Sequence, residues 1–250
     1  MPQARAFIEP VGGGVAAYAG PSSPMNKMIG VGFDGVPPEG RLQEIENLFA
    51  ERNEALQAEI STLADPAFAA ELTKRGYVLR NFENVSARSI VAADRELPNP
   101  DGIRIDLMTT TNAGEWVDAA VTGFLHADGE GVQADELPPR DELDRALRPF
   151  AVADGLRRYC AWIDGQLAGV ASLRIDDGVA QLCGATTLPA FRRRGVQAAL
   201  LRARLADAAR TDCDIAVLTT QPGSTSQNNS HRQGFALLYA RALLVKPVAA

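Results

Sequence analysis

A run of arginines followed by a glycine is the stretch of this sequence with the clearest chemistry. Residues 192–195 read Arg-Arg-Arg-Gly, between an apolar run of small residues at 179–187 and a run with helical spacing from Val196. Glycine allows a close backbone turn, and the free N–H groups at the positive end of a helix bind anions. We therefore predict a strand, a tight basic loop and a helix, with a phosphate-bearing ligand at the loop.

The run after the loop is predicted to be an amphipathic helix. Leu201, Leu205 and Ala208 recur at near-fourfold spacing and predict one apolar stripe. The arginines of the same run fall outside that stripe: Arg202, Arg204 and Arg210.

This loop resembles the signature of the GNAT (Gcn5-related N-acetyltransferase) superfamily, which is Arg or Gln, two residues, Gly, one residue, then Gly or Ala. Arg192 and Gly195 match, whereas Gln197 stands where the second Gly or Ala is expected. In that family the backbone amides of the loop hold the pyrophosphate of acetyl-CoA. The resemblance thus implies acetyl-CoA as co-substrate and the following loop residues as its site: Arg192, Arg193, Arg194, Gly195, Val196, Gln197 and Ala198.

The elements before the loop predict an antiparallel meander. Apolar runs at 158–163, 167–175 and 179–187 are joined by Asp164-Gly165 and Asp176-Asp177-Gly178, and Asp-Gly pairs favour tight hairpins. A strand at 215–219, a short helix within 222–233 and a strand at 236–245 are expected after the basic helix. The order from residue 100 onward follows that of the GNAT fold, so we predict an α/β fold with a mixed sheet flanked by helices.

The first part of the chain repeats this order in shortened form. Gly32 and Pro37 recur with the same spacing as Gly184 and Pro189, and Gly76-Tyr77 recurs as Gly234-Phe235. Expected elements are strands at 12–20, 28–33 and 56–62, helices at 40–53 and from Pro66, and one or two strands within 77–90. The first copy lacks the Arg-x-x-Gly pattern. The resemblance implies a tandem protein, with a degenerate GNAT-like half at 1–95 and a complete acetyl-CoA-binding domain at 100–250.

Further ligand contacts follow from the resemblance. In the GNAT fold the strand before the loop diverges from the next strand, and the pantetheine arm of CoA lies between them. Thr186, Thr187 and Leu188 would line this space, although the threonines are equally consistent with ordinary sheet residues. The family often places an Asn and a Ser near the last helix against the arm, which makes Asn229 and Ser226 the candidates here. The spacing of Ser224 and Gln227 predicts a helix cap.

Catalytic groups are less well marked. The family commonly has a general-acid Tyr where this sequence has Ser230. Tyr239, His231 or water would then protonate the leaving thiolate. The strand before the loop has no Asp or Glu, and although Glu83 and Glu115 are conceivable bases we assign none. Positioning and backbone polarisation of the thioester are sufficient for direct attack by an amine.

Composition narrows the class of partner. The net charge is −6, with 31 acidic and 25 basic residues, which argues against nucleic acid as the main partner. No apolar run is long enough to span a membrane, and no signal peptide is evident. The cysteines, Cys160, Cys183 and Cys213, lie far apart in apolar runs without metal-ligand spacing. We expect reduced thiols, no metal and a cytoplasmic protein.

These observations predict an enzyme that transfers an acetyl group from acetyl-CoA to an amine of a small molecule or peptide. A non-catalytic acyl-CoA-binding or sensor protein is the alternative, because the usual Tyr and strand carboxylate are missing. A scaffold that has lost its ligand is a third class. The acceptor is open, as is the choice between monomer and homodimer.

Overall fold

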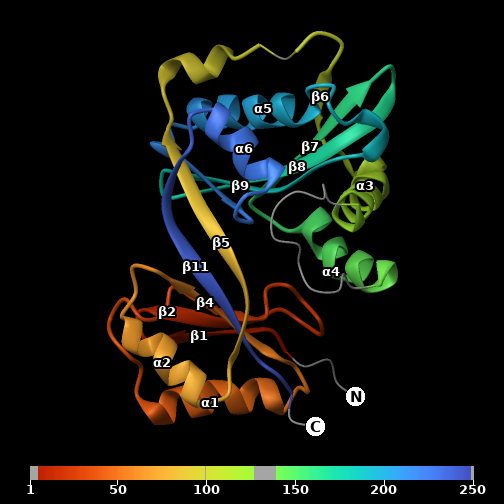
Figure 1. Cartoon of the computed structure of the whole chain (residues 1–250). Coiled ribbons are helices and arrows are strands. Elements are labelled where there is room, and N and C mark those ends of the chain that lie inside the picture. Colours follow the sequence, from red (N-terminus) through yellow and green to blue (C-terminus); the bar gives the residue numbers. More distant parts are fainter. Residues whose placement is uncertain (1–4, 99, 127–138, 249–250) are drawn as a thin grey trace. The chain divides into compact units, whose positions relative to one another are not determined.

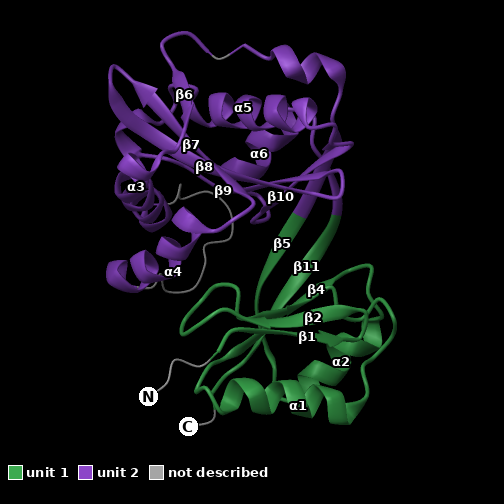
Figure 2. Ribbon diagram, turned by 180° about the vertical axis from the view of Figure 1, so that it is seen from behind, with its two compact units in different colours: residues 1–84, 239–250 green, residues 85–238 purple. Residues whose placement is uncertain are grey.

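The computed structural model describes residues 5–98, 100–126 and 139–248. The chain forms two compact units (Figure 2). Unit 1 comprises residues 1–84 and 239–250, and unit 2 comprises residues 85–238. The chain passes between them along two strands, β5 (Val78–Ser89) and β11 (Ala236–Lys246), each of which contributes residues to both units.

Unit 1 is a sheet with helices packed against it (Figure 1). Its strand order is β1-β2-β3-β4-β11, antiparallel throughout except for the parallel pair β3 and β4. Besides the shared strands, its elements are β1 (Phe7–Val11), β2 (Gly14–Tyr18), β3 (Lys27–Ile29), α1 (Glu39–Ala50), β4 (Leu56–Ser61) and α2 (Pro66–Lys74).

Its core joins one face of that sheet to the two helices. Leu42, Ile45 and Phe49 of α1, with Phe68 and Leu72 of α2, are almost fully buried, as the helical spacing of apolar residues requires. The start of α2 agrees with the sequence. The Asp65 carboxylate accepts a hydrogen bond from Ala67 N (2.9 Å), and Pro66 occupies the first turn.

Unit 2 has the strand order β5-β10-β9-β8-β7-β6. The predicted meander is present, since β7–β8 and β8–β9 are antiparallel. Its elements are η1 (Ala92–Glu96), β6 (Arg104–Leu107), η2 (Thr110–Asn112), α3 (Ala113–Leu125), α4 (Arg140–Val152), β7 (Leu156–Ile163), β8 (Gln166–Asp176), β9 (Val179–Thr187), η3 (Pro189–Phe191), α5 (Val196–Arg210), β10 (Ile215–Thr220) and α6 (Thr225–Arg232).

The hairpin turns of the meander have the conformation that Asp-Gly pairs favour. Asp164 and Gly165 have φ of 51° and 77°, and Asp177 and Gly178 have φ of 45° and 74°. Two consecutive left-handed residues are the geometry of a type I′ turn, whose twist matches that of the flanking strands. These turns fix the register of β7, β8 and β9.

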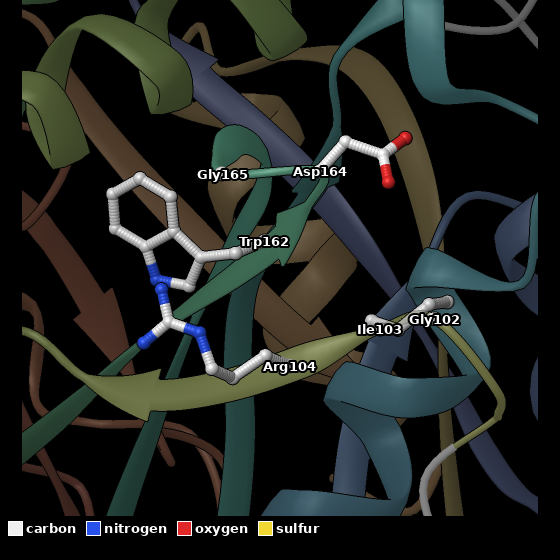
Figure 3. Close-up of a pocket in the computed structure, with 6 residues that line it drawn as sticks. All are labelled: Gly102, Ile103, Arg104, Trp162, Asp164 and Gly165. Atoms are coloured by element: carbon white, nitrogen blue, oxygen red, sulfur yellow. The ribbon is translucent and has the colours of Figure 1, made fainter.

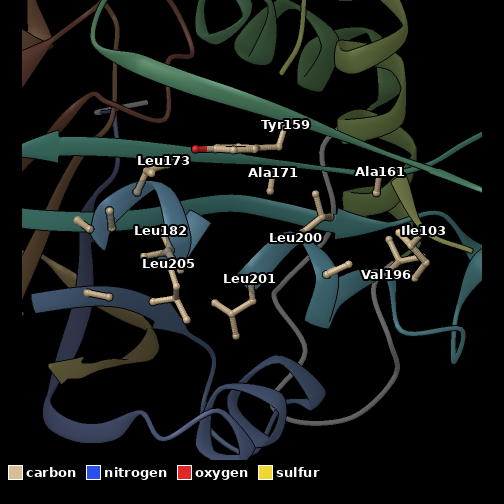
Figure 4. Close-up of a cluster of buried hydrophobic side chains, with 14 of the residues drawn as sticks. Ile103, Tyr159, Ala161, Ala171, Leu173, Leu182, Val196, Leu200, Leu201 and Leu205 are labelled. Carbon is tan, nitrogen blue, oxygen red and sulfur yellow. The ribbon is translucent and has the colours of Figure 1, made fainter. Parts of the chain in front are cut away.

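Helices cover both faces of the sheet in unit 2. One core includes Tyr159 and Leu173 from the sheet and Leu200 and Leu205 from α5 (Figure 4). The other includes Cys160 and Val170 and the buried side of α3. Neighbouring residues of one strand thus enter opposite cores, as the alternation of a strand requires.

The predicted repeat is visible in the element order. In each copy a three-stranded antiparallel meander is followed by a loop, a helix, a strand parallel to the third strand, a helix and a final strand. The compact units differ in extent from the predicted segments, because β5 continues into unit 2 and residues 239–250 are part of unit 1. The assignment of 1–95 as a degenerate half stays a prediction.

The strand predicted at 12–20 is present as β2, but β1, which the sequence analysis did not predict, precedes it and pairs with it. The strand expected at 28–33 ends at Ile29, since Gly30 and Gly32 adopt left-handed φ values of 69° and 96° that end an extended strand. The acidic run with glycine and proline at 128–139 predicts a loop, and it falls mainly outside the described residues. Among the helices that the structure describes, none combines the length and apolar character needed to cross a membrane.

Candidate functional site

The backbone of the basic loop leaves several amide groups at the start of α5. Gly195 is the residue before the helix and has φ 86°, and Arg193 has φ 59°. The first backbone bond of the helix runs from Ala199 N to Gly195 O (3.0 Å). The amides of Val196, Gln197 and Ala198 thus precede the first intrahelical bond, and no side chain caps them at Gly195. This is the arrangement of an anion site at a helix N-terminus.

The arginines surround this helix end with positive charge. Arg192 donates to the backbone oxygen of His126 through Nη2, Arg193 is exposed, and Arg194 lies 5.7 Å above the Phe191 ring and 3.6 Å from Asp164 Oδ2. The first turn of α5 contains no acidic residue. The loop is therefore a local basic site in an acidic protein.

Next to the loop, β9 and β10 stop pairing before they end. Their parallel register runs from Val179–Ile215 to Leu182–Leu218, whereas β9 continues to Thr187 and β10 to Thr220. Within these described strands, residues 183, 186 and 187 thus have partners on β8, and none of the residues 183–187 has a partner on β10. Unpaired strand backbone can bond an extended ligand.

A β-bulge accompanies this divergence. Val170 pairs with Thr186 and Ser172 with Cys183, so that the one residue between them on β8 faces two residues on β9, one of them Gly184. Gly184 has φ 56°, the left-handed conformation that one class of bulge requires. A bulge bends its strand, and here it lies where β9 leaves β10.

The predicted strand residues have different environments. Thr186 is 9% exposed and packs against α3, because a Cβ added to Gly123 would lie 1.8 Å from Thr186 Oγ1. Leu188 packs at the edge of the α3 core and donates its N–H to Ala168 O (2.9 Å). Thr187 Oγ1 is buried and has no hydrogen-bond partner within the described residues.

Thr220 is a residue that the sequence analysis missed. It ends β10, is 7% exposed, and its hydroxyl likewise has no partner within the described part of the chain. A buried hydroxyl without a partner costs free energy, so Thr187 and Thr220 offer two polar groups to a ligand. The Thr219-Thr220 pair at the end of an apolar strand was the available signal.

The residues proposed on α6 have separate contacts. Ser224 caps the helix as predicted, accepting from Gln227 N (3.2 Å). Ser226 is exposed. Asn229 is half-buried, and its Oδ1 accepts from Arg232 Nη1 (2.8 Å).

The weak catalytic candidates have different environments. Ser230, at the position of the family's general-acid Tyr, is 2% exposed and donates its hydroxyl to Gln227 O (2.8 Å). His231 is exposed in the last turn of α6. Tyr239 belongs to unit 1, while the loop belongs to unit 2. No general acid or base is assigned.

The thiols are unpaired in the structure. Burial raises the pKa of Cys160 to about 12 and also raises that of Cys183. Since the thiolate is the reactive form, neither side chain has the character of an activated nucleophile.

A pocket of about 330 Å³ adjoins the loop (Figure 3). Figure 3 shows the Arg104 guanidinium beside the Trp162 indole, 5.5 Å from its centre, while Asp164 points elsewhere. Asp164 links the pocket to Arg194. None of the predicted site residues lines it. Its lining is Gly102, Ile103, Arg104, Trp162, Asp164 and Gly165.

Comparisons with known proteins agree with this geometry. Residues 125–235 match the model of the acetyltransferase (GNAT) family. A GCN5-related N-acetyltransferase from Kribbella flavida superposes with a TM-score of 0.69 at 19% identity, over 98% of this chain and 90% of that one. No curated protein matches significantly.

Two further structures share the fold. A functionally unknown conserved protein from Staphylococcus epidermidis ATCC 12228 gives a TM-score of 0.67 at 13% identity, covering 98% of this chain and 94% of that one. A tandem GNAT protein from the clavulanic acid biosynthesis pathway gives 0.63 at 15% identity, covering 95% and 79%. At these identities the likeness concerns the fold. The likeness shows the fold, and the family match shows a GNAT acetyltransferase domain at residues 125–235.

Proposed function

We propose that this protein binds acetyl-CoA at the loop before α5 and transfers the acetyl group to an amine of a small molecule or peptide. One observation carries the proposal. The backbone amides of residues 196–198, which follow Gly195, are uncapped, and three arginines, residues 192–194, directly precede them. Acetyl transfer is the activity of the matched family. An anion at a helix N-terminus gains from both the free amides and the helix dipole.

In this proposal the pyrophosphate lies on the loop amides, with Arg193 and Arg194 supplying a positive field. The pantetheine arm bonds the backbone of residues 183–187 on the side that β10 leaves unpaired. Thr187 and Thr220 supply hydroxyls to its amides or to the thioester. The acceptor nitrogen forms a bond to the thioester carbon and gives up a proton to water, the C–S bond breaks, and the CoA sulfur leaves with a proton from water or from a side chain.

A second candidate is a non-catalytic acyl-CoA-binding or sensor protein. Two observations favour it. Ser230 is a poor acid for a leaving thiolate and already donates its hydroxyl to Gln227 O, and β9 contains no Asp or Glu. Both candidates use the same ligand site and differ in turnover.

The decisive experiment has two measurements on the full chain. Calorimetry with acetyl-CoA tests binding, and release of free CoA thiol in the presence of a panel of amines tests transfer. Amine-dependent thiol release supports the enzyme. Binding without release for any amine supports the sensor, and the absence of binding contradicts both.

We also propose that the repeated first half carries no second acetyl-CoA site. The support is that α1 begins after Pro38 with Glu39 in its first turn, where a phosphate would meet a carboxylate and a missing N–H.

A further inference from the structure

Arg204 lies in the middle of α5 and is 2% exposed. The spacing of apolar residues placed it outside the buried stripe of the helix, and that expectation was wrong. It faces the sheet together with Leu200 and Leu205. Burial lowers the pKa of Arg204 to about 10, which still leaves the guanidinium charged near neutral pH.

Among the described residues no carboxylate pairs with this charge. The nearest acid along the helix, Asp207, instead accepts from the Tyr159 hydroxyl (2.7 Å) and pairs with Arg210 (3.0 Å) and Arg157 (3.8 Å). A buried charge without a counter-charge is costly. An apolar side chain of similar size would fill the position at lower cost.

The guanidinium is satisfied by backbone oxygens. Nε donates to Leu200 O (3.0 Å), and Nη1 donates to Ser172 O (3.2 Å) and, at the limit of hydrogen-bond distance, to Cys183 O (3.5 Å). Ser172 and Cys183 face each other across β8 and β9, and they are the last pair before the bulge at Gly184. The same side chain therefore bonds both strands at the bulge.

The bulge is also where β9 leaves β10. The last parallel pair is Leu182–Leu218, and Cys183 follows directly. A bulge interrupts the ladder and leaves polar groups to be satisfied from elsewhere. Arg204 supplies donors at this point from the helix that also carries the basic loop at its N-terminus.

We infer that Arg204 is a positioning residue, which holds the β9 bulge and thereby keeps the backbone of residues 183–187 open to the pantetheine arm of acetyl-CoA. This inference rests on the proposed function. It explains a buried charge that neither the loop nor the acceptor chemistry uses.

The test compares Arg204→Met with Arg204→Lys and Tyr159→Phe. Methionine fills the position without donors, and lysine keeps a charge and a donor. Tyr159→Phe removes the buried bond to Asp207 in the same core and removes none of the hydrogen bonds of Arg204 to Leu200, Ser172 and Cys183. Each variant is assayed for thermal unfolding, for acetyl-CoA binding by calorimetry, and for amide hydrogen exchange of residues 179–188 in the free protein.

For Arg204→Met we expect faster exchange at residues 183–187 and an acetyl-CoA Kd raised by about tenfold or more, equivalent to about one lost hydrogen bond. Arg204→Lys should restore part of the slow exchange and part of the affinity for acetyl-CoA. Tyr159→Phe should change the unfolding temperature without changing the exchange of residues 183–187 or the acetyl-CoA Kd. A merely structural role predicts instead that affinity follows unfolding temperature in all variants.

The inference is overturned if Arg204→Met binds acetyl-CoA like the parent and shows unchanged exchange. It is also overturned if Tyr159→Phe lowers the unfolding temperature as much as Arg204→Met does and weakens acetyl-CoA binding as much. If Arg204→Met does not fold, the exchange and the affinity of Arg204→Lys are compared with those of Tyr159→Phe instead. If the parent itself binds no acetyl-CoA, the proposed function fails. The exchange of residues 183–187 in the free protein still decides whether Arg204 holds the bulge.

Discussion

The loop before α5 and the loop before α1 occupy equivalent places in two copies of one element order, and only one has the chemistry of a phosphate site. α5 follows Gly195 with φ 86° and has no acid in its first turn. α1 follows Pro38 and begins with Glu39. Arg41, the nearest arginine to the start of α1, bonds Glu9 (2.8 Å) and Glu44 (2.9 Å). The same element order thus accommodates both loops, and a few loop residues decide which of them has the chemistry expected of a phosphate site.

The strands beside the two loops also differ in whether their polar side chains have partners. In unit 2 the ends of β9 and β10 carry Thr187 and Thr220, whose hydroxyls have no partner among the described residues. In unit 1, β3 and β4 are joined by the ion pair of Lys27 with Glu59 (2.6 Å), and Glu59 also pairs with Arg241. Polar groups that are already satisfied leave little for a ligand. The comparison therefore supports the proposal that the ligand binds to unit 2, and it gives the Lys27, Glu59 and Arg241 side chains of unit 1 a structural role.

The largest expected difference between the two loops is that the α5 loop binds acetyl-CoA and the α1 loop does not. Acetyl-CoA should bind the full chain with a stoichiometry of one, because the α5 loop offers uncapped amides without an acid in the first turn, whereas α1 begins with Glu39. Calorimetry measures this directly. A stoichiometry of two would break the comparison between the loops.

Gly195→Val should weaken acetyl-CoA binding by about 100-fold or more, since each charge-assisted hydrogen bond contributes about 1.5–3 kcal/mol. A β-branched residue disfavours φ 86° and obstructs the approach of a phosphate. Calorimetry gives the affinity, and circular dichroism reports the fold.

Gly155→Val is the matched control. Gly155 is an exposed residue with φ 71° and no atom within 4 Å of an added Cβ, so it introduces similar strain away from the loop. Equal losses of affinity in both variants, or parent-like binding by Gly195→Val with an intact fold, would show that the loop does not bind the ligand.

Glu46→Gln should destabilise unit 1 by about 2 kcal/mol without changing acetyl-CoA affinity, because Glu46 pairs with Arg75 (2.9 Å) and Lys246 (2.7 Å) and its side chain is 4% exposed. Burial opposes ionisation of Glu46, but the bonds to Arg75 and Lys246 hold its pKa below the ordinary value of 4.5.

The pH dependence follows from that direction. A depressed folded-state pKa contributes stability that is present above the unfolded value near 4.5 and is lost as the pH falls through the folded pKa. The unfolding temperature of the parent should therefore fall more steeply than that of Glu46→Gln as the pH falls below about 4.5. Parallel declines would indicate that the ion pairs contribute no net stability.

The smallest effect is expected for Arg193→Ala and Arg194→Ala. Both side chains are exposed, so each should weaken acetyl-CoA binding by less than about tenfold through a screened field. The loss should shrink in high salt, whereas that of Gly195→Val should persist. Arg145→Ala, an exposed arginine on α4, controls for the change in net charge. A salt-independent loss would mean that an arginine bonds the ligand directly.

The sequence by itself determined the features that depend on a few neighbouring residues. The Asp-Gly turns, the Asp65 and Ser224 caps and the strand–loop–helix around Gly195 follow from local backbone preferences. The repeated element order was also readable, since it is a succession of such local signals. The GNAT resemblance rested on the same kind of short motif and agrees with the family match.

The tertiary structure alone decided which distant residues meet. Arg204 is buried because β8 and β9 present carbonyl oxygens to it at a bulge, and no pattern within α5 encodes those oxygens. Thr220 became part of the candidate site only when the register of β9 and β10 was known. Likewise, β11 runs on into unit 1 to pair with β4, because strand pairing depends on partners far along the chain and a helical or alternating pattern carries no record of them.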